Sequence, residues 1–286
     1  MARRSSRTVW LGKVSFIDRH PGQLSLVADN FAETLAKALD PDKRIKYYRE
    51  WRLSEPHLDH ATGTLSAQLG FRRPTRQEEV DYDEEKHAWV SSEAPARHGN
   101  YAHFIVDLAS QLIAFEDRGT DLNRDAFVAA LGRFLETARL EVNLISDTAE
   151  FDAWLDQIDR VTRFRVTLRV PNPGFSKRAK EVRELVMETQ AERITIEAQS
   201  DDGLNVRDTL LDGAADTAAL GNGSFKATGF AGKSRRFFDS ARRFLSGTIE
   251  VSAQDSSATI TNKITDLMRE IAPPLPEHDN DTPNGS

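Results

Sequence analysis

Residues 101–117 read YAHFIVDLASQLIAFED, two short apolar runs separated by a few polar residues. Apolar runs of this length that contain β-branched and aromatic residues are typical of strands. Residues 121–138 follow, and they place Phe127, Leu131 and Phe134 three or four positions apart. That spacing predicts a helix with one buried face.

The alternation of strands and helices continues outward from this stretch. Downstream, we expect strands at 139–145, 163–170, 193–199 and 248–253, and helices at 148–158, 177–190 and 256–271. Upstream, we expect strands at 9–16, 44–52 and 63–71 and a helix at 29–39. This order favours an α+β fold with mixed or antiparallel sheets, short helices packed on one face, and split βαβ-like elements.

An acidic, turn-rich segment at 74–99, loop-like apart from a strand expected at 88–91, suggests how the chain is divided. We expect an N-terminal α+β module at 1–99 that ends in this acidic loop, and a C-terminal α+β module at 100–272. Residues 273–286 are rich in proline, asparagine, aspartate and glycine. A segment with so few residues to bury is expected to be a disordered tail.

Composition excludes several classes of protein. The 38 basic and 45 acidic residues give a net charge of -7, which argues against a polybasic protein whose whole surface attracts nucleic acid. The absence of cysteine excludes disulfides, thiolate metal sites and a cysteine nucleophile. No apolar window reaches the roughly 18 residues of a membrane span, so we expect a cytoplasmic protein without direct membrane insertion.

Common catalytic motifs are absent from the sequence. No HExxH, calcium-binding loop or GxSxG elbow occurs, and the glycines near Lys233 do not have the spacing of a phosphate-binding loop. We therefore expect no catalytic residues, no metal and no cofactor. One alternative is a nuclease that uses a divalent metal, built on Glu197, Asp201, Asp202, Asp208, Asp212 and Asp216.

The basic segment 225–244, FKATGFAGKSRRFFDSARRF, stands out in an acidic chain. Cations that are spaced among aromatic residues suit phosphate contacts and base stacking. The candidate nucleic-acid-binding residues here are Lys226, Lys233, Arg235, Arg236, Arg242 and Arg243. A second candidate group opens the helix at 177–190, and it comprises Lys177, Arg178, Lys180 and Arg183. The alternative for 225–244 is a solvated basic loop over a phenylalanine-lined core.

The order of segments over 142–230 resembles the family of the phage-exclusion protein RexA. The resemblance is carried by VNLIS, FDAWLDQI, FRVTLRV, KRAKEVRELV, ITIEAQSDDG and GSFKATG, in that order. It implies a cytoplasmic DNA-binding component of a bacterial or prophage defence system, a homodimer or larger homo-oligomer, acting with a separate membrane effector protein. It supplies no catalytic residues.

Three hypotheses follow. The first is a non-enzymatic DNA-binding component of an abortive-infection or phage-exclusion system, with largely sequence-independent phosphate contacts. The second is the metal-dependent nuclease. The third is a protein-interaction module whose acidic run at 77–85 docks a basic partner.

Overall fold

The computed structural model describes residues 4–17, 31–72, 77–83, 88–94, 99–169, 180–189, 191 and 193–273. Its largest element is a nine-stranded sheet in which every strand pair is antiparallel. The sheet contains β1 (Arg4–Phe16), β2 (Ile45–Tyr47), β3 (Arg49–Leu53), β4 (His57–Asp59), β5 (Thr64–Arg72), β8 (Gly99–Asp107), β9 (Leu112–Glu116), β10 (Leu140–Leu144) and β15 (Ser246–Ser252). Strand β1 is an interior strand of this sheet that pairs with three others. It pairs with β9 along one edge and with β10 and β15 along the other.

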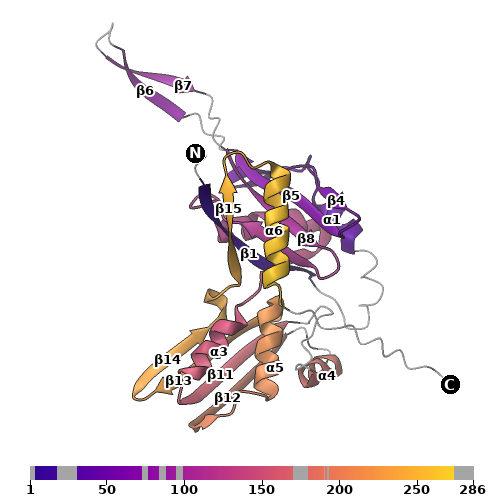
Figure 1. The fold of residues 1–286 in the computed structure, drawn as a ribbon, viewed down its shortest axis with the longest axis vertical. Coiled ribbons are helices and arrows are strands. Elements are labelled where there is room, and N and C mark those ends of the chain that lie inside the picture. The colour runs from indigo at the N-terminus through magenta and orange to yellow at the C-terminus, as the bar shows by residue number, and fades with distance from the viewer. Residues whose placement is uncertain are drawn as a thin grey trace, which may run out of the picture.

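Helices cover both faces of this sheet (Figure 1). Helices α1 (Phe31–Ala38) and α2 (Arg124–Leu135) pack on one face, and α6 (Ser257–Ile271) packs on the other. Phe104 on β8 faces α2, and its neighbour Ile105 faces α6. Two covered faces explain why the sequence of β8 and β9 is almost continuously apolar.

The helix expected after these strands is α2, and its apolar stripe is buried as expected. Phe127 stacks on Phe115 of β9 with ring centroids 4.1 Å apart. The side chain of Asn123 accepts a hydrogen bond from the backbone N–H of Ala126, 2.9 Å away, and so caps the first turn.

A second sheet has the order β12-β11-β13-β14. Its strands are β11 (Arg160–Arg169), β12 (Arg193–Leu204), β13 (Gly223–Ala231) and β14 (Ser234–Asp239), and they are accompanied by α3 (Thr148–Asp156), α4 (Lys180–Thr189) and α5 (Leu210–Thr217). Strands β12 and β13 are both antiparallel to β11, and α5 connects them. They are therefore parallel to each other with one strand between them, which is a split βαβ unit. The predicted α+β fold is confirmed, with helices on one face of the second sheet but on both faces of the first.

Hydrogen bonds connect the two sheets. The backbone N–H of Ser146, just after β10, donates to the carbonyl of Ala219 at 2.8 Å, and that of Asp147 donates to the carbonyl of Arg243 at 2.9 Å. Ala219 belongs to the π-helical turn η5 (Ala218–Asn222), and Arg243 follows the 3-10 turn η6 (Ser240–Arg242). The second sheet is thus attached to the first at both ends of the β13–β14 hairpin.

Three expectations differ from the structure in detail. The expected division at residue 99 runs through the first sheet, because β5 pairs with β8 along its whole length. The strand expected at 44–52 is split into β2 and β3 by Tyr48, whose φ of 55° turns the chain. The expected acidic loop contains a hairpin of β6 (Gln77–Asp83) and β7 (Ala88–Ala94) that forms a separate sheet.

Two further expectations concern the last helix and the residues that follow it. The expected helix at 256–271 is α6. Residues 274–286, most of the expected tail, lie outside the described residues. In the described part of the chain, no helix combines the length and the hydropathy that crossing a bilayer requires.

Candidate nucleic-acid interface

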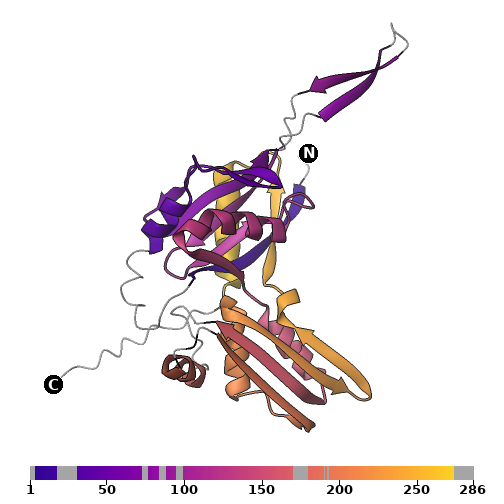
Figure 2. The ribbon, with the colours of Figure 1, turned by 180° about the vertical axis from the view of Figure 1, so that it is seen from behind.

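The second sheet has one face against helices and one face toward solvent. Phe164 and Val166 on β11 are buried beneath α3 and α5, whereas Arg163 and Arg165, which alternate with them, are exposed. Figure 2 shows the sheet from the side opposite α3 and α5, where no drawn helix lies over the four strands. We call this solvent-exposed side the open face.

Cations outnumber carboxylates on the open face. Its basic side chains are Arg160, Arg163, Arg165 and Arg169 on β11, Arg193 on β12, Lys226 on β13 and Arg235 on β14. Its acidic side chains are Glu197, Asp201 and Asp239. Because the whole chain is acidic, this excess of positive charge is local.

Some of these cations are neutralised by neighbours. The Arg163 Nε donates to Glu197 Oε1 across the β11–β12 pair at 2.7 Å, and the Lys226 Nζ lies 3.1 Å from Asp239 Oδ2. Such exposed pairs contribute little to stability, and a phosphate can compete for their cations. Among the described residues, no carboxylate lies within ion-pair distance of Arg165 or Arg235.

An exposed aromatic ring lies among the cations. Phe237 on β14 keeps 62% of its surface exposed, whereas the next residue, Phe238, is 2% exposed within the core. The guanidinium of Arg235 lies over the Phe237 ring, 4.8 Å from its centroid. A flat aromatic ring beside an unpaired guanidinium can stack on a nucleobase while the cation meets the adjoining phosphate.

A second aromatic and arginine pair extends this pattern along the open face. Arg160 lies over the ring of Phe230, 5.1 Å from its centroid, and the two residues face each other across the β11–β13 pair. Phe230 is half-buried, so this ring offers less surface than Phe237.

The residues predicted in 225–244 do not lie in a loop, because β13, a tight turn and β14 form a hairpin there. Lys226 and Arg235 lie on the open face, and Lys233 lies in the turn after Gly232, whose φ is 57°. Arg236 is exposed but pairs with Gly229 on the helix-covered side.

Arg242 and Arg243 lie beyond β14, at one end of the open face. Arg242 Nε is 3.9 Å from Asp239 Oδ2. Arg243 forms an ion pair with Glu150 of α3 and lies over the ring of Phe238, 5.3 Å from its centroid. Arg243 therefore has structural partners that Arg235 lacks.

The side chains of the second predicted group, at 177–183, are not described by the structure. Lys177 and Arg178 lie outside the described residues, and so do the side chains of Lys180 and Arg183 on α4. Near the N-terminus, Arg7 belongs to β1 and pairs with the buried Glu116, so it does not extend the basic surface.

Sequence reasoning missed the arginines of β11. The signal was present, because Arg163, Arg165, Thr167 and Arg169 alternate with apolar residues in RFRVTLRV. Period-two spacing places such residues on one face of a strand. Arg165 lies between Lys226 on β13 and Glu197 on β12, near the centre of the open face.

A groove continues from the open face toward the first sheet. Its volume is about 790 Å³, and its lining includes Lys226, Phe237, Arg242, Trp10 of β1 and Phe244. The groove is bounded by both sheets and joins aromatic and basic side chains, as the open face does.

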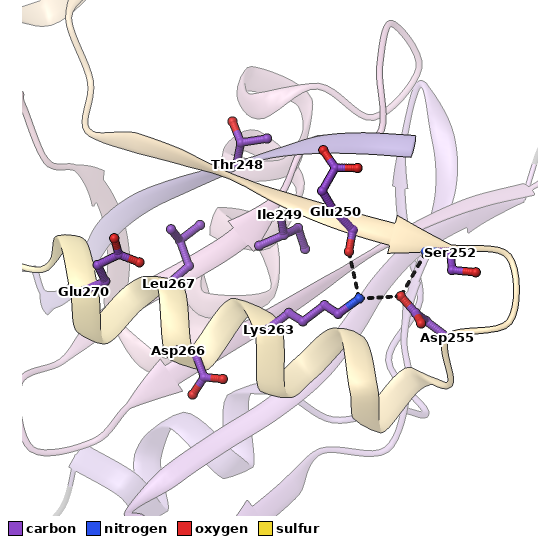
Figure 3. A pocket seen from close by; sticks show the side chains of 9 residues that line it. All are labelled: Thr248, Ile249, Glu250, Ser252, Asp255, Lys263, Asp266, Leu267 and Glu270. Carbon is purple, nitrogen blue, oxygen red and sulfur yellow. Dashed lines mark hydrogen bonds and ion pairs between the residues drawn. The ribbon is translucent and has the colours of Figure 1, made fainter. Parts of the chain in front are cut away.

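A second groove, between β15 and α6, has the opposite character (Figure 3). Its volume is about 490 Å³, and it is lined by Glu250, Asp255, Asp266 and Glu270. Lys263 donates to Asp255 at 2.6 Å and to the backbone carbonyl of Glu250 at 2.7 Å. This acidic groove does not extend the basic surface.

The carboxylates considered for a nuclease lie on different elements. Glu197 is on the open face with Arg163, while Asp212 is buried at the start of α5 and accepts the backbone N–H of Asp208 at 3.1 Å. Within the described residues, no three His, Asp or Glu side chains are arranged to hold a metal ion.

Comparison with known proteins places the chain in a family. The family model described as "Domain of unknown function (DUF4747)" matches residues 73–268, which is more than half of the chain and includes the whole second sheet and most of α6. No curated protein matches the sequence. The description of the family names no activity. By this match, the chain belongs to the DUF4747 family.

Proposed function

We propose that this protein binds single-stranded nucleic acid on the open face of its second sheet, with phosphates at the arginines and a base stacked on Phe237. The observation that carries the proposal is the exposed Phe237 ring beside Arg235 on a face where cations outnumber carboxylates. Binding of this kind requires no cofactor and no catalytic step.

The charge distribution supports phosphate binding. A phosphodiester backbone releases counterions when it meets lysine and arginine, and this gives affinity without sequence preference. Arg165 and Arg235 contribute most in this proposal, because among the described residues they have no carboxylate partner to give up. Lys233 at the tip of the hairpin extends the track.

The shape of the face supports a single strand over a duplex. Bases within a duplex present only their edges, whereas an unpaired base can place its ring against an aromatic side chain. Phe237 lies on an open sheet rather than on a helix or wedge that would enter a groove. Four-stranded sheets with exposed aromatic residues bind single strands in this way in other proteins.

The resemblance to the RexA family supports a biological setting. In this proposal the protein is the cytoplasmic DNA-binding component of an anti-phage defence system, and it forms a homodimer or larger homo-oligomer. A separate effector protein acts at the membrane. Sedimentation of the purified chain with and without DNA tests the oligomer, and a monomer in both conditions contradicts that part of the proposal.

The binding site is tested by anisotropy of labelled single-stranded DNA, single-stranded RNA and duplex DNA of equal length. The double variant Arg165→Ala with Arg235→Ala is expected to weaken binding to each sequence equally. Arg269→Ala is the matched control, because it removes an exposed arginine from α6, away from the open face. If Arg269→Ala weakens DNA binding as much as the double variant does, the result contradicts the proposed site.

The same samples separate the alternatives. With magnesium present, the DNA is recovered after binding and its length is compared with that of the input. Intact DNA supports a binding protein, and cleavage supports the nuclease hypothesis. If RNA binds much more tightly than DNA, the result supports the phosphate and stacking contacts but contradicts the proposed role as a DNA sensor in defence.

A further inference from the structure

A buried histidine on the first sheet joins a carboxylate to a serine hydroxyl. His103 lies on β8, is 2% exposed and points to the side covered by α6. Its Nδ1 is 2.8 Å from Glu116 Oε1, and its Nε2 is 2.8 Å from Ser257 Oγ. Serine, histidine and carboxylate in this order, at these distances, are the arrangement that activates a serine nucleophile.

The carboxylate is held in its ionised form. Glu116 is fully buried, and burial raises the pKa of its carboxyl, but the hydrogen bonds from the His103 ring, the His103 backbone N–H and Arg7 outweigh burial and lower the pKa overall. Arg7 donates to Glu116 Oε2 at 2.6 Å. An ionised Glu116 accepts the Nδ1–H of His103, which leaves Nε2 as the atom that can take a proton.

Ser257 is placed to give that proton. Gln68 Nε2 lies 2.7 Å from Ser257 Oγ and 3.1 Å from His103 Nε2. The amide nitrogen only donates, so the Ser257 hydroxyl keeps its own hydrogen to direct at His103 Nε2. The preceding residue, Ser256, caps α6 through the backbone N–H of Thr259 at 3.1 Å. Ser257 is exposed to solvent and is not needed as the cap.

The start of α6 also supplies hydrogen-bond donors. The backbone N–H groups of the first helical turn have no acceptor within their own helix. Those of Ser257 and Ala258 lie in this turn, next to the hydroxyl, and α6 is 15 residues long. Donors in this position can stabilise the oxyanion that forms when a carbonyl is attacked.

We propose that Ser257, His103 and Glu116 form an acyl-transfer site that hydrolyses carboxylic esters. Ser257 Oγ attacks the carbonyl carbon, and its proton passes to His103 Nε2. The C–O bond of the ester then breaks, and His103 gives the proton to the departing alcohol. Water attacks the resulting acyl-serine with His103 again as base, which releases the carboxylic acid and restores the hydroxyl.

The surroundings define the substrate class. Tyr101, 48% exposed, lies beside His103 with ring centroids 5.4 Å apart, so an exposed aromatic ring borders the imidazole. An open site of this kind suits small acyl groups or an ester carried on a larger molecule. The site is on the first sheet, so it does not depend on the open face. It departs from the sequence-based expectation of a protein without catalytic residues.

The test uses the full chain and two probes, a fluorophosphonate and p-nitrophenyl acetate. The fluorophosphonate forms a bond between Ser257 Oγ and phosphorus while fluoride leaves with the serine proton, and peptide mass spectrometry locates the modified residue. We expect modification at Ser257, and ester hydrolysis that falls about 100-fold or more in Ser257→Ala. Ser234→Ala is the control, because it removes an exposed serine from β14 of the second sheet, and it is expected to keep both reactions.

His103→Asn tests the base, and its folding is checked by thermal unfolding because the residue is buried. Modification of the unaltered chain is also measured against pH, which needs no variant. We expect Glu116→Gln to slow this modification and to alter its dependence on pH, because the variant removes the carboxylate that accepts the Nδ1–H of His103. Equal modification of Ser256 and Ser257, or unchanged hydrolysis in Ser257→Ala, overturns the proposal.

Discussion

Replacing Phe237 by alanine isolates the stacking contact on the open face. Phe237 is 62% exposed and its ring is outside the core, so the substitution should change the free energy of unfolding by less than about 0.5 kcal/mol. Stacking of one base on an aromatic ring contributes about 1–3 kcal/mol in proteins that bind single strands. The dissociation constant for single-stranded DNA should therefore rise about 5- to 150-fold.

The assay is anisotropy of a labelled single strand and of the matching duplex at constant salt. Duplex binding should change little, because its bases are not available to the ring. Tyr48→Ala is the matched control, since Tyr48 is 93% exposed on the β2–β3 turn of the first sheet. A Phe237→Ala protein that binds the single strand as tightly as the unaltered chain refutes the stacking contact.

Three other predictions concern charge and packing. Arg165→Ala and Arg235→Ala should each reduce the slope of log K against log salt by about 0.7 for a single strand, measured between about 50 and 200 mM salt. Burial lowers the pKa of Lys13 from 10.5 to about 8. The cost of burying the charged amine therefore destabilises the folded state fully below pH 8, and this cost is relieved as pH rises toward 10.5. Urea unfolding should show stability rising by up to about 3 kcal/mol over that range, and Lys13→Met should remove the rise. A Cβ at Gly223 would lie 2.0 Å from the carbonyl oxygen of Thr167, so Gly223→Ala should lower thermal stability by about 1–3 kcal/mol or more, and an unchanged melting temperature contradicts the β11–β13 packing.

The secondary structure near residue 101 was predictable because burial on two faces leaves a strong apolar signal. The runs in β8 and β9 are continuous since Phe104 and Ile105 face different helices. The pairing of these strands was not predictable. Strand β15 joins β1 across more than two hundred residues, and no local pattern records which distant strand completes a sheet.

The candidate interface was predicted in part. The basic run at 225–244 contributes Lys226 and Arg235 to the open face, and it forms the β13–β14 hairpin rather than the solvated basic loop of the alternative hypothesis. Read with a period of two, the same residues form a strand with Phe238 inward and Phe237 outward. The arginines of β11 are recognisable only once that period is applied to 163–169.

The serine, histidine and glutamate cluster could not be predicted from the sequence. His103, Glu116 and Ser257 lie in no shared motif, and the first two are separated from the third by the entire second sheet. Only the packing of α6 on β8 brings Ser257 to the ring of His103.

The most direct test of nucleic-acid binding is a salt series with the unaltered chain, with single-stranded and duplex DNA compared in the presence of magnesium. Binding should weaken steeply as salt rises, the single strand should bind more tightly than the duplex, and the DNA should be recovered intact. Absence of binding to either form at low salt contradicts the account, because a face with an excess of exposed arginines and an exposed phenylalanine would then have no affinity for phosphate or base.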